Sequence, residues 1–596
     1  AETGARAIAG TINIVLREGF RRRLNDLRLG LGVERGLASP GAFWTWNDTR
    51  GELTANLNAG GFLRRSEDPS TIESDTTGGD DPGRWTEQRL SQATRRGLNA
   101  GARLQWRLGT GGDMLLLSPS LFHADNRGRS TAQRSTAEGV PRYELASGES
   151  EGRFTNLRLN GQWRQRLGPG RLESSLTGGL WRSEGESVRE ESAGGTLLRT
   201  QDERNRTQER SLRLNGKYSL LLGGDDAGRG EHSGVGGFEL EAARRSEARR
   251  LREDGVPQLG EFGDELDADS LRLALYLQDE WAPTPQWALH FGLRWEGIRT
   301  TGDAGVTGDG GGRPTSLNRV LTPLAHAVWK PDPASRSQLR LSLTRSWRAP
   351  GLGNLIARPR LADDNAPNAP DRAGNPGLQP ELATGIDLAW EHYPAGGGVF
   401  SANLFHRRIR DLMRSVTALE DVPWSETPRW VSRTRNVGDA TTQGLELEAK
   451  GRLDQWWAGA PRTELRANVA LFRSRVAGLP GPDNRLEQQA DGTLNLGADH
   501  AWRGLPLKTG VTLNWVPGYR TQLSETQVAE LGSRRVVDAY ALWTVEPGVA
   551  LRLSAGNLLP RDGRETTRFD DGSLRSEERT VSPSAVAWRL QLELRL

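Results

Sequence analysis

Three arginines in a polar, proline-rich stretch are the residues of this chain best suited to bind a ligand. Arg358, Arg360 and Arg372 follow Trp347 closely in the sequence. A guanidinium group presents a planar fork of donors that matches carboxylate and phosphate oxygens, so the group would suit an anionic chelate or a glycan. Arginine is abundant here, because nearly all of the 79 basic residues are arginine. These four residues are therefore candidate ligand contacts, with ordinary surface charge as the alternative.

No other residue group has a pattern typical of a catalytic or metal site. Paired aspartates at 225–226 and 363–364 could bind Ca²⁺, but solvated loop charge is the simpler interpretation. The glycine-rich run 308–312 lacks the Lys-Ser/Thr of a phosphate-binding loop. The chain has no cysteine, which excludes thiol chemistry. We predict no enzyme, bound metal or cofactor. The seven histidines, which lack metal-ligand spacing, are His123, His232, His290, His326, His392, His406 and His500.

The elements that must position the candidate residues alternate with a period of two. Leucines fill every odd position of 271–277, and 588–596 alternates Trp or Leu with polar residues. Such alternation predicts strands with one apolar face. The chain has no apolar run of about 18 residues, so a membrane helix is excluded. A barrel with an apolar outer face and a wet lumen explains why only 35% of residues are hydrophobic.

We predict an all-β fold, a transmembrane antiparallel β-barrel of about 22 strands. Each strand should be about ten to fourteen residues long, as tilted barrel strands are. The second strand, near residue 40, has the weakest pattern. The predicted strands start near residues 24, 40, 51, 97, 114, 153, 171, 209, 231, 268, 286, 319, 336, 381, 397, 441, 461, 491, 506, 534, 549 and 584.

The connections between these strands alternate in length, which is typical of outer-membrane barrels with short periplasmic turns and long extracellular loops. Short turns lie near residues 109–112, 168–170, 223–230, 282–285, 331–335, 394–398, 504–505 and 547–548. Long polar loops are expected near 64–96, 126–152, 185–208, 245–267, 300–318, 348–380, 410–440, 476–490, 519–533 and 559–583. Tryptophans beside the short turns suggest an aromatic girdle at the membrane interface: Trp106, Trp281, Trp287, Trp329, Trp502 and Trp543.

Two segments around the candidate arginines resemble motifs of TonB-dependent outer-membrane receptors. The segment 347–350 resembles the family's "FRAP" motif, and the segment 374–381 resembles its "GNPxLxPE" motif. The order of the two segments and the distance between them make the pair specific to the family. Further resemblances to this family occur near 275–281, 291–295, 405–412, 436–446 and 554–559. Leu596 departs from the aromatic residue that usually ends the family's chains. The motif residues are Trp347, Arg348, Ala349 and Pro350, then Gly374, Asn375, Pro376, Leu378, Pro380 and Glu381.

The resemblance implies two domains. Residues 1–23 resemble the last part of a plug domain, and 24–596 would form the barrel. The TonB complex would then act through an N-terminal region not included in this sequence. The location implied is the outer membrane of a Gram-negative bacterium.

The function implied is energy-coupled uptake of a scarce ligand, most often a ferric siderophore. A glycan, cobalamin or another metal chelate is the alternative within the family, and an ungated diffusion porin is the alternative outside it. The expected partners are outer-membrane lipid, lipopolysaccharide and a small extracellular ligand, with the protein a monomer. A net charge of +3 gives no indication of nucleic-acid binding.

Overall fold

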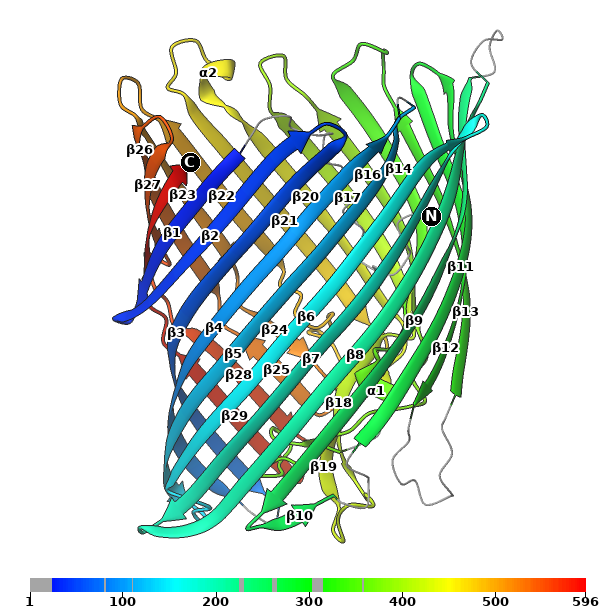
Figure 1. Ribbon diagram of the computed structural model, residues 1–596. Coiled ribbons are helices and arrows are strands. Elements are labelled where there is room, and N and C mark those ends of the chain that lie inside the picture. The colour runs from blue at the N-terminus through cyan, green and yellow to red at the C-terminus, as the bar shows by residue number, and fades with distance from the viewer. Residues whose placement is uncertain are drawn as a thin grey trace.

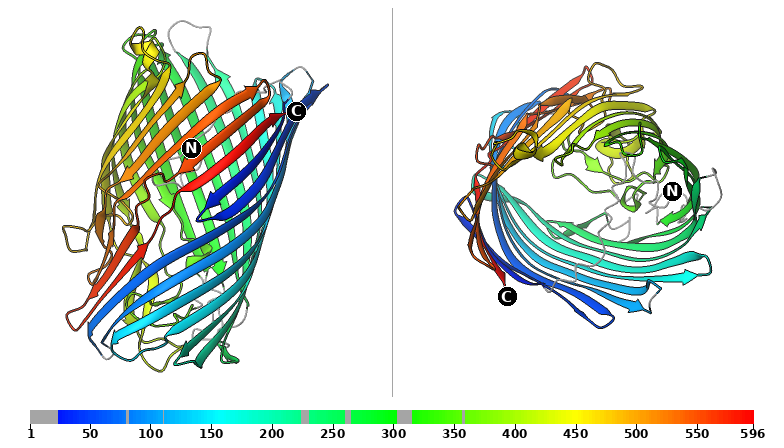
Figure 2. Two further views of the ribbon diagram at one scale, coloured as in Figure 1. Left: turned by 90° about the vertical axis from the view of Figure 1, so that its left-hand side faces the viewer. Right: turned by 90° about the horizontal axis from the view of Figure 1, so that it is seen from above.

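The strands form one closed antiparallel barrel, as Figures 1 and 2 show. The computed structural model describes residues 24–79, 82–109, 111–223, 230–259, 265–302, 315–355 and 359–596. The expected plug segment, 1–23, lies outside the described residues. The ring closes where Leu29 of the first strand faces Leu592 of the last. No helix in the described part of the chain is long and apolar enough to cross a membrane.

Twenty-two strands make up the barrel wall, which confirms the predicted fold class. The weakly patterned second strand is among them. The wall strands are β1 (Leu24–Glu34), β2 (Leu37–Arg50), β3 (Leu53–Gly78), β4 (Gly83–Leu108), β5 (Asp113–Glu138), β6 (Leu145–Leu167), β7 (Gly170–Ala193), β8 (Thr196–Leu222), β9 (Glu231–Glu253), β11 (Glu265–Thr284), β12 (Trp287–Gly302), β13 (Thr315–Trp329), β14 (Ser337–Arg348), β16 (Glu381–His392), β17 (Val399–Arg410), β20 (Ala440–Arg452), β21 (Thr463–Val476), β22 (Gly492–Ala501), β23 (Leu507–Val516), β26 (Arg534–Glu546), β27 (Val549–Gly556) and β30 (Ala587–Arg595).

The strands β3 to β9 are much longer than the sequence pattern predicts. They contain 23 to 27 residues each, so most of 64–96, 126–152 and 185–208 continues the sheet. The prediction of loops there was wrong. Beyond the apolar belt both faces of these strands are polar, so the alternation that identifies a strand disappears although the backbone pairing continues. Cross-strand ion pairs such as Arg127–Glu151, at 3.2 Å, join neighbouring strands in this outer region.

Shorter strands extend the wall at the same end of the barrel. They fall in the predicted loops 245–267, 519–533 and 559–583. The order β24–β25–β28–β29 ends on the outer half of β3, where Leu574 faces Gly78. Figure 1 shows these strands in its lower half. They are β10 (Val256–Gln258), β24 (Tyr519–Gln522), β25 (Gln527–Leu531), β28 (Gly563–Asp570) and β29 (Leu574–Ser582).

A second, three-stranded sheet lies apart from the wall. It pairs β15 (Asp371–Arg372) in parallel with β19 (Arg429–Asn436), which forms an antiparallel hairpin with β18 (Met413–Glu420). Two short helices, α1 (Leu352–Leu355) and α2 (Leu453–Trp456), complete the described elements. Seen along the barrel axis, chain from the middle of the sequence fills part of the ring in Figure 2.

Leucines form the outer face of the wall. In β11, Leu271 and Leu277 are 50% and 68% exposed, whereas Arg272 and Gln278 on the opposite face are 3% and 5% exposed. Across β27, β30 and β1, Leu592 lies beside Leu551 and Leu29. Alternate residues of a strand point to opposite faces, so these leucines form an apolar belt around the barrel.

The register of β30 gives a direct test of this belt. Leu592→Arg should lower the free energy of unfolding in lipid by about 2–4 kcal/mol, because a charge would enter the bilayer, whereas the lumen-facing Gln591→Arg should cost little. Urea-induced unfolding of the two variants in lipid vesicles measures the difference. Equal losses would contradict the assigned faces.

Candidate functional site

Residues 359–380, which we call the strap, run through the lumen between β14 and β16. On one side the strap is held by β25 and β29, which extend the wall. The Gln527 side-chain amide donates to the Pro367 carbonyl at 3.1 Å, and the Asn368 amide donates to Ser576 Oγ at 3.1 Å. The strap therefore bridges distant parts of the wall.

The second family motif fastens the end of the strap to the β18–β19 hairpin. The Asn375 backbone N–H donates to Asn354 O at 2.7 Å, and its side-chain amide donates to Thr434 O at 3.0 Å. Asn375 Oδ1 accepts the Gly377 N–H at 3.0 Å, which fixes the local turn. Leu378 is buried beside this turn. Asn375 thus acts as a structural tie among three segments.

The first family motif meets the second at a buried carboxylate. Arg348 pairs with Glu381 across the β14–β16 ladder, with Nη2 and Oε1 2.8 Å apart. Glu381 also accepts the Met413 N–H at 2.7 Å and is 1% exposed. Trp347, one residue before Arg348, is 1% exposed. The two motifs therefore join the wall to the start of the hairpin.

Asp371 is the central fastening of the strap. It is 0% exposed and accepts two hydrogen bonds from Arg429, at 2.6 and 2.9 Å. Trp424 Nε1 and the Ala362 N–H donate to it at 2.9 and 2.8 Å. Burial alone would raise the pKa of Asp371, but the hydrogen bonds from Arg429, Ala362 and Trp424 hold that pKa below its ordinary value.

The arginines singled out from the sequence lie on or beside the strap. Arg360 and Arg372 are exposed, and their backbones pair with N···O distances of 2.7 and 2.9 Å. Arg358 lies outside the described residues. Trp347 is buried, so its indole does not face an open lumen. The role of these residues in ligand binding remains a prediction.

Sequence reasoning missed a second arginine group, on the inner wall facing the strap. Arg134 of β5 lies 4.0 Å from the Trp85 ring centre and 4.2 Å from that of Tyr143. It pairs with the fully buried Glu87 at 3.0 Å, and Glu87 accepts the Tyr143 hydroxyl at 2.5 Å. Burial and the bond to Glu87 raise the pKa of Tyr143 to about 12. These residues lie far apart in sequence within predicted loops, so no local pattern identified them.

An aromatic row lines the inner wall on the same side. Phe62, Phe122, Phe154 and Trp181 come from β3, β5, β6 and β7, with successive ring centres 6.4, 6.0 and 6.2 Å apart. They share the face of their strands opposite to the leucines. Aromatic faces bind apolar or planar groups and attract cations. The row is therefore a surface suited to planar ligand groups inside the lumen.

Further along the inner wall, buried charges neutralise one another. Arg294 pairs with Glu239 at 2.8 Å and also with Glu296, and both Arg294 and Glu296 are 0% exposed. Arg272 pairs with Glu241 at 2.7 Å and with Glu296 at 3.4 Å. A closed network of this kind holds neighbouring strands together.

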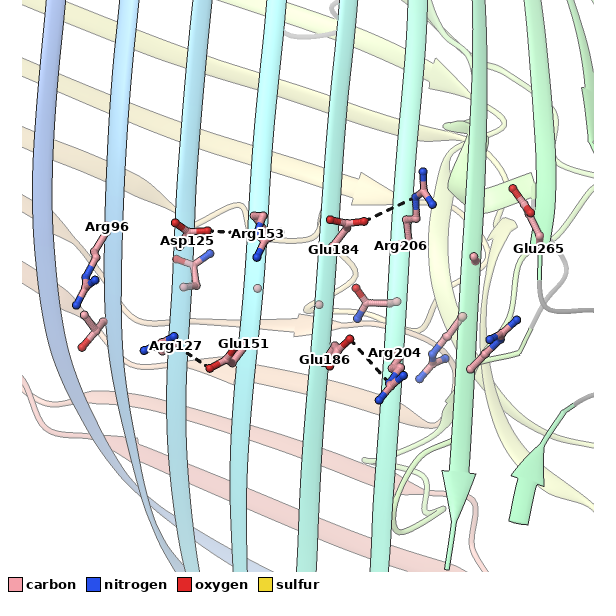
Figure 3. A pocket seen from close by; sticks show the side chains of 18 residues that line it. Arg96, Asp125, Arg127, Glu151, Arg153, Glu184, Glu186, Arg204, Arg206 and Glu265 are labelled. Atoms are coloured by element: carbon pink, nitrogen blue, oxygen red, sulfur yellow. Dashed lines mark ion pairs between the residues drawn. The ribbon is translucent and has the colours of Figure 1, made fainter. Parts of the chain in front are cut away.

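A cavity on the outer face of the wall does not belong to the lumen. It measures about 720 Å³ and crosses β4 to β9 just beyond the leucine belt. Figure 3 shows its charged side chains in two rows across the strands. The ion pairs include Arg153–Asp125 at 3.5 Å and Arg204–Glu186 at 3.8 Å. Each row contains both acidic and basic groups, so the cavity has no marked preference for an ion of either sign.

Within the part of the chain that the structure describes, no three His, Asp or Glu side chains come close enough to hold a metal ion. The paired aspartates Asp363 and Asp364 lie instead against arginines of the inner wall. The site as described is thus a lumen crossed by a fastened strap and lined by arginine and aromatic side chains.

Comparison with solved structures gives the fold independently. The siderophore receptor PiuA from Acinetobacter baumannii is 13% identical with a TM-score of 0.62, covering 98% of this chain and 82% of that chain. The ferric enterobactin receptor PfeA from Pseudomonas aeruginosa is also 13% identical with a TM-score of 0.62. The match covers 99% of this chain and 83% of that chain. The ferric citrate transporter FecA, unliganded, is 12% identical with a TM-score of 0.62, covering 97% and 79%. At such identities the likeness shows the fold alone.

Sequence comparison gives the family. No curated protein matches the chain. The family model described as "TonB dependent receptor-like, beta-barrel" matches residues 116–558, which is more than half of the chain. The chain therefore belongs to the TonB-dependent receptor family, non-enzymatic transporters whose 22-stranded barrels are typical of the Gram-negative outer membrane.

Proposed function

We propose that this receptor takes up a ferric siderophore by transport coupled to the TonB complex. The observation that carries the proposal is the strap, which crosses the lumen and is fastened to the hairpin through Asp371 and Asn375. A solute of chelate size would have to move or pass the strap, as expected of a gated path. The solved structures with this fold include receptors named for siderophores and ferric citrate, which supports a ferric chelate as the ligand.

The remaining parts of the proposal concern the partners. Residues 1–23 would form the end of a plug domain, and TonB would act on a region preceding them. The leucine belt would contact outer-membrane lipid, with lipopolysaccharide around the outer half of the wall, and the protein would act as a monomer. Family membership argues against the ungated porin. A glycan, cobalamin or another chelate is the alternative that the ligand experiment distinguishes.

Ligand class is tested by binding to intact cells. A deletion strain carrying the gene on a plasmid would be incubated with labelled ferric siderophores, ferric citrate, cobalamin and a maltodextrin. We expect saturable binding of a ferric chelate that excess unlabelled chelate displaces and that the deletion strain lacks. Saturable binding of only the glycan or cobalamin would replace the siderophore proposal.

The orientation of the barrel is tested by cysteine labelling, because the protein has no cysteine of its own. Val140, 80% exposed, lies between β5 and β6, and Pro169 lies in the two-residue turn between β6 and β7 at the opposite end. In intact cells an impermeant maleimide should label Val140→Cys and leave Pro169→Cys unlabelled. Both should react in permeabilised cells, as the control. The reverse pattern in intact cells would invert the orientation.

A further inference from the structure

Two aspartates of the strap lie against a group of arginines on the inner wall. Asp364 pairs with Arg134 at 3.4 Å and also with Arg142. Arg189 lies 3.8 Å from Asp363, and Arg199 donates to the Asp363 carbonyl oxygen at 3.2 Å. The arginines come from β5, the β5–β6 connection, β7 and β8. Four guanidinium groups thus converge on one short acidic segment.

The wall side of this contact is rigid. The Arg134 side chain is 8% exposed and is held by Glu87 and by the Trp85 and Tyr143 rings. Glu191, 7% exposed, pairs with Arg189 at 2.9 Å and with Arg199 at 2.8 Å. A guanidinium held by an internal carboxylate on one side keeps donors free to face the lumen on the other. The arginine group is therefore preformed.

The strap side is more loosely held. The Asp363 and Asp364 side chains are 50% and 26% exposed, so solvent screens part of their attraction to the arginines. The backbone on either side of the two aspartates is fastened, because the Ala362 N–H donates to the buried Asp371 and Asn365 exchanges two hydrogen bonds with the Trp430 backbone. The two aspartate side chains can therefore turn away from the wall while the strap backbone stays in place.

Removing the two aspartates changes the balance of charge at the wall. A fifth arginine, Arg89, joins the four already named, because it pairs with Glu87 at 2.7 Å. The wall carboxylates facing them are Glu87, Glu191, Glu253 and Glu578. Asp363 and Asp364 supply part of the negative charge that faces these arginines, so moving the two carboxylates away leaves the group more positive.

We propose that this arginine group is a binding site for a ligand with several carboxylates, and that Asp363 and Asp364 occupy it while no ligand is bound. The strap carboxylates stand where the ligand's carboxylates would bind, so the two compete for the same guanidinium donors. A polycarboxylate carries more negative charge than the aspartate pair and can satisfy several arginines at once. Binding turns the Asp363 and Asp364 side chains away from the arginines. The site rests on the proposed function, since it gives the proposed ligand its chemical class.

The test measures citrate binding to the purified protein in detergent by calorimetry. Asp363→Asn with Asp364→Asn removes the internal competitor and should tighten citrate binding about tenfold. Arg199→Gln, which loses one donor from a partly exposed side chain, should weaken binding about tenfold. Trimethyl citrate, which lacks the charges, should not bind.

Matched controls carry the same changes on the outer face. Asp125→Asn and Arg127→Gln alter residues whose side chains are 55% and 74% exposed, with ion-pair partners on neighbouring strands. Both should bind citrate as the unchanged protein does. Gel mobility of the heated and unheated barrel checks that each variant is folded.

The proposal is overturned if the double asparagine variant binds citrate no more tightly than the unchanged protein, or if adding Arg199→Gln to the double variant leaves its citrate affinity unchanged. The proposal is also overturned if Asp125→Asn raises the citrate affinity as much as the double asparagine variant does. If only the double variant binds citrate, the proposal is supported. The two aspartates then explain why the unchanged protein has the lower citrate affinity. Because the assay needs neither iron nor TonB, citrate binding without iron uptake would overturn the siderophore proposal and leave this site standing.

Discussion

Asp371→Ala is expected to loosen the middle of the strap where it meets the β18–β19 hairpin, lowering the free energy of local opening by about 3–5 kcal/mol. The substitution leaves the Arg429 guanidinium, Trp424 Nε1 and the Ala362 N–H without their shared acceptor. Hydrogen exchange of 359–380 measures the effect. Exchange should rise most at Ala362 and around Asp371, where the shared acceptor is lost, while the wall strands stay protected.

The control for this prediction is Asp332→Ala. Asp332 is an exposed aspartate in the β13–β14 connection, where it accepts the Ala334 N–H at 2.9 Å. Its loss should leave strap exchange unchanged. Unchanged exchange of the strap in Asp371→Ala would contradict the central role given to Asp371.

The lowered pKa of Asp371 fixes the pH at which the unchanged strap should loosen. A carboxylate with a lowered folded pKa contributes its full stability above the ordinary value of 3.8 and loses it as pH falls through the lowered value. Faster exchange of the strap should therefore appear only below about pH 4.

Trp347→Ala should destabilise the barrel by about 3–5 kcal/mol, since a buried indole is replaced by a methyl group. Ligand affinity should stay within about twofold, because a side chain that is 1% exposed has no surface to offer a ligand. Unfolding in lipid and chelate binding to intact cells measure the two quantities. Trp287→Ala is the control, since Trp287 is 42% exposed and its loss opens no internal cavity. Unchanged stability with lost binding would make Trp347 a ligand contact instead.

Much of the wall follows from the sequence, because burial on one face imposes a period of two. Leu271 to Leu277 and Leu590 to Leu594 specify both the strands and their outward face, and the predicted number of 22 strands is confirmed. The outer halves of β3 to β9 do not follow, because Arg127, Glu151 and Glu186 place charge where the pattern would need an apolar residue. The backbone is paired in these outer halves, but the side chains show no apolar–polar alternation from which a strand could be predicted.

The site follows from the sequence only in part. The two family motifs were identified, and the structure gives Arg348, Asn375 and Glu381 structural contacts. The arginine group on the inner wall was missed, because Arg134 and Asp364 are 230 positions apart. The contact between these two residues forms only when the strap folds into the lumen. Sequence spacing carries no information about a contact of this kind.

In the proposed function, the lumen is a gated path driven by TonB. The most direct test of this function is uptake of a radiolabelled ferric chelate, the one bound by intact cells, in strains that express this receptor with and without TonB. We predict equal surface binding in the two strains and accumulation inside the cell only in the strain with TonB. Equal accumulation in both strains would contradict the claim, because it would mean that the chelate diffuses through an ungated barrel.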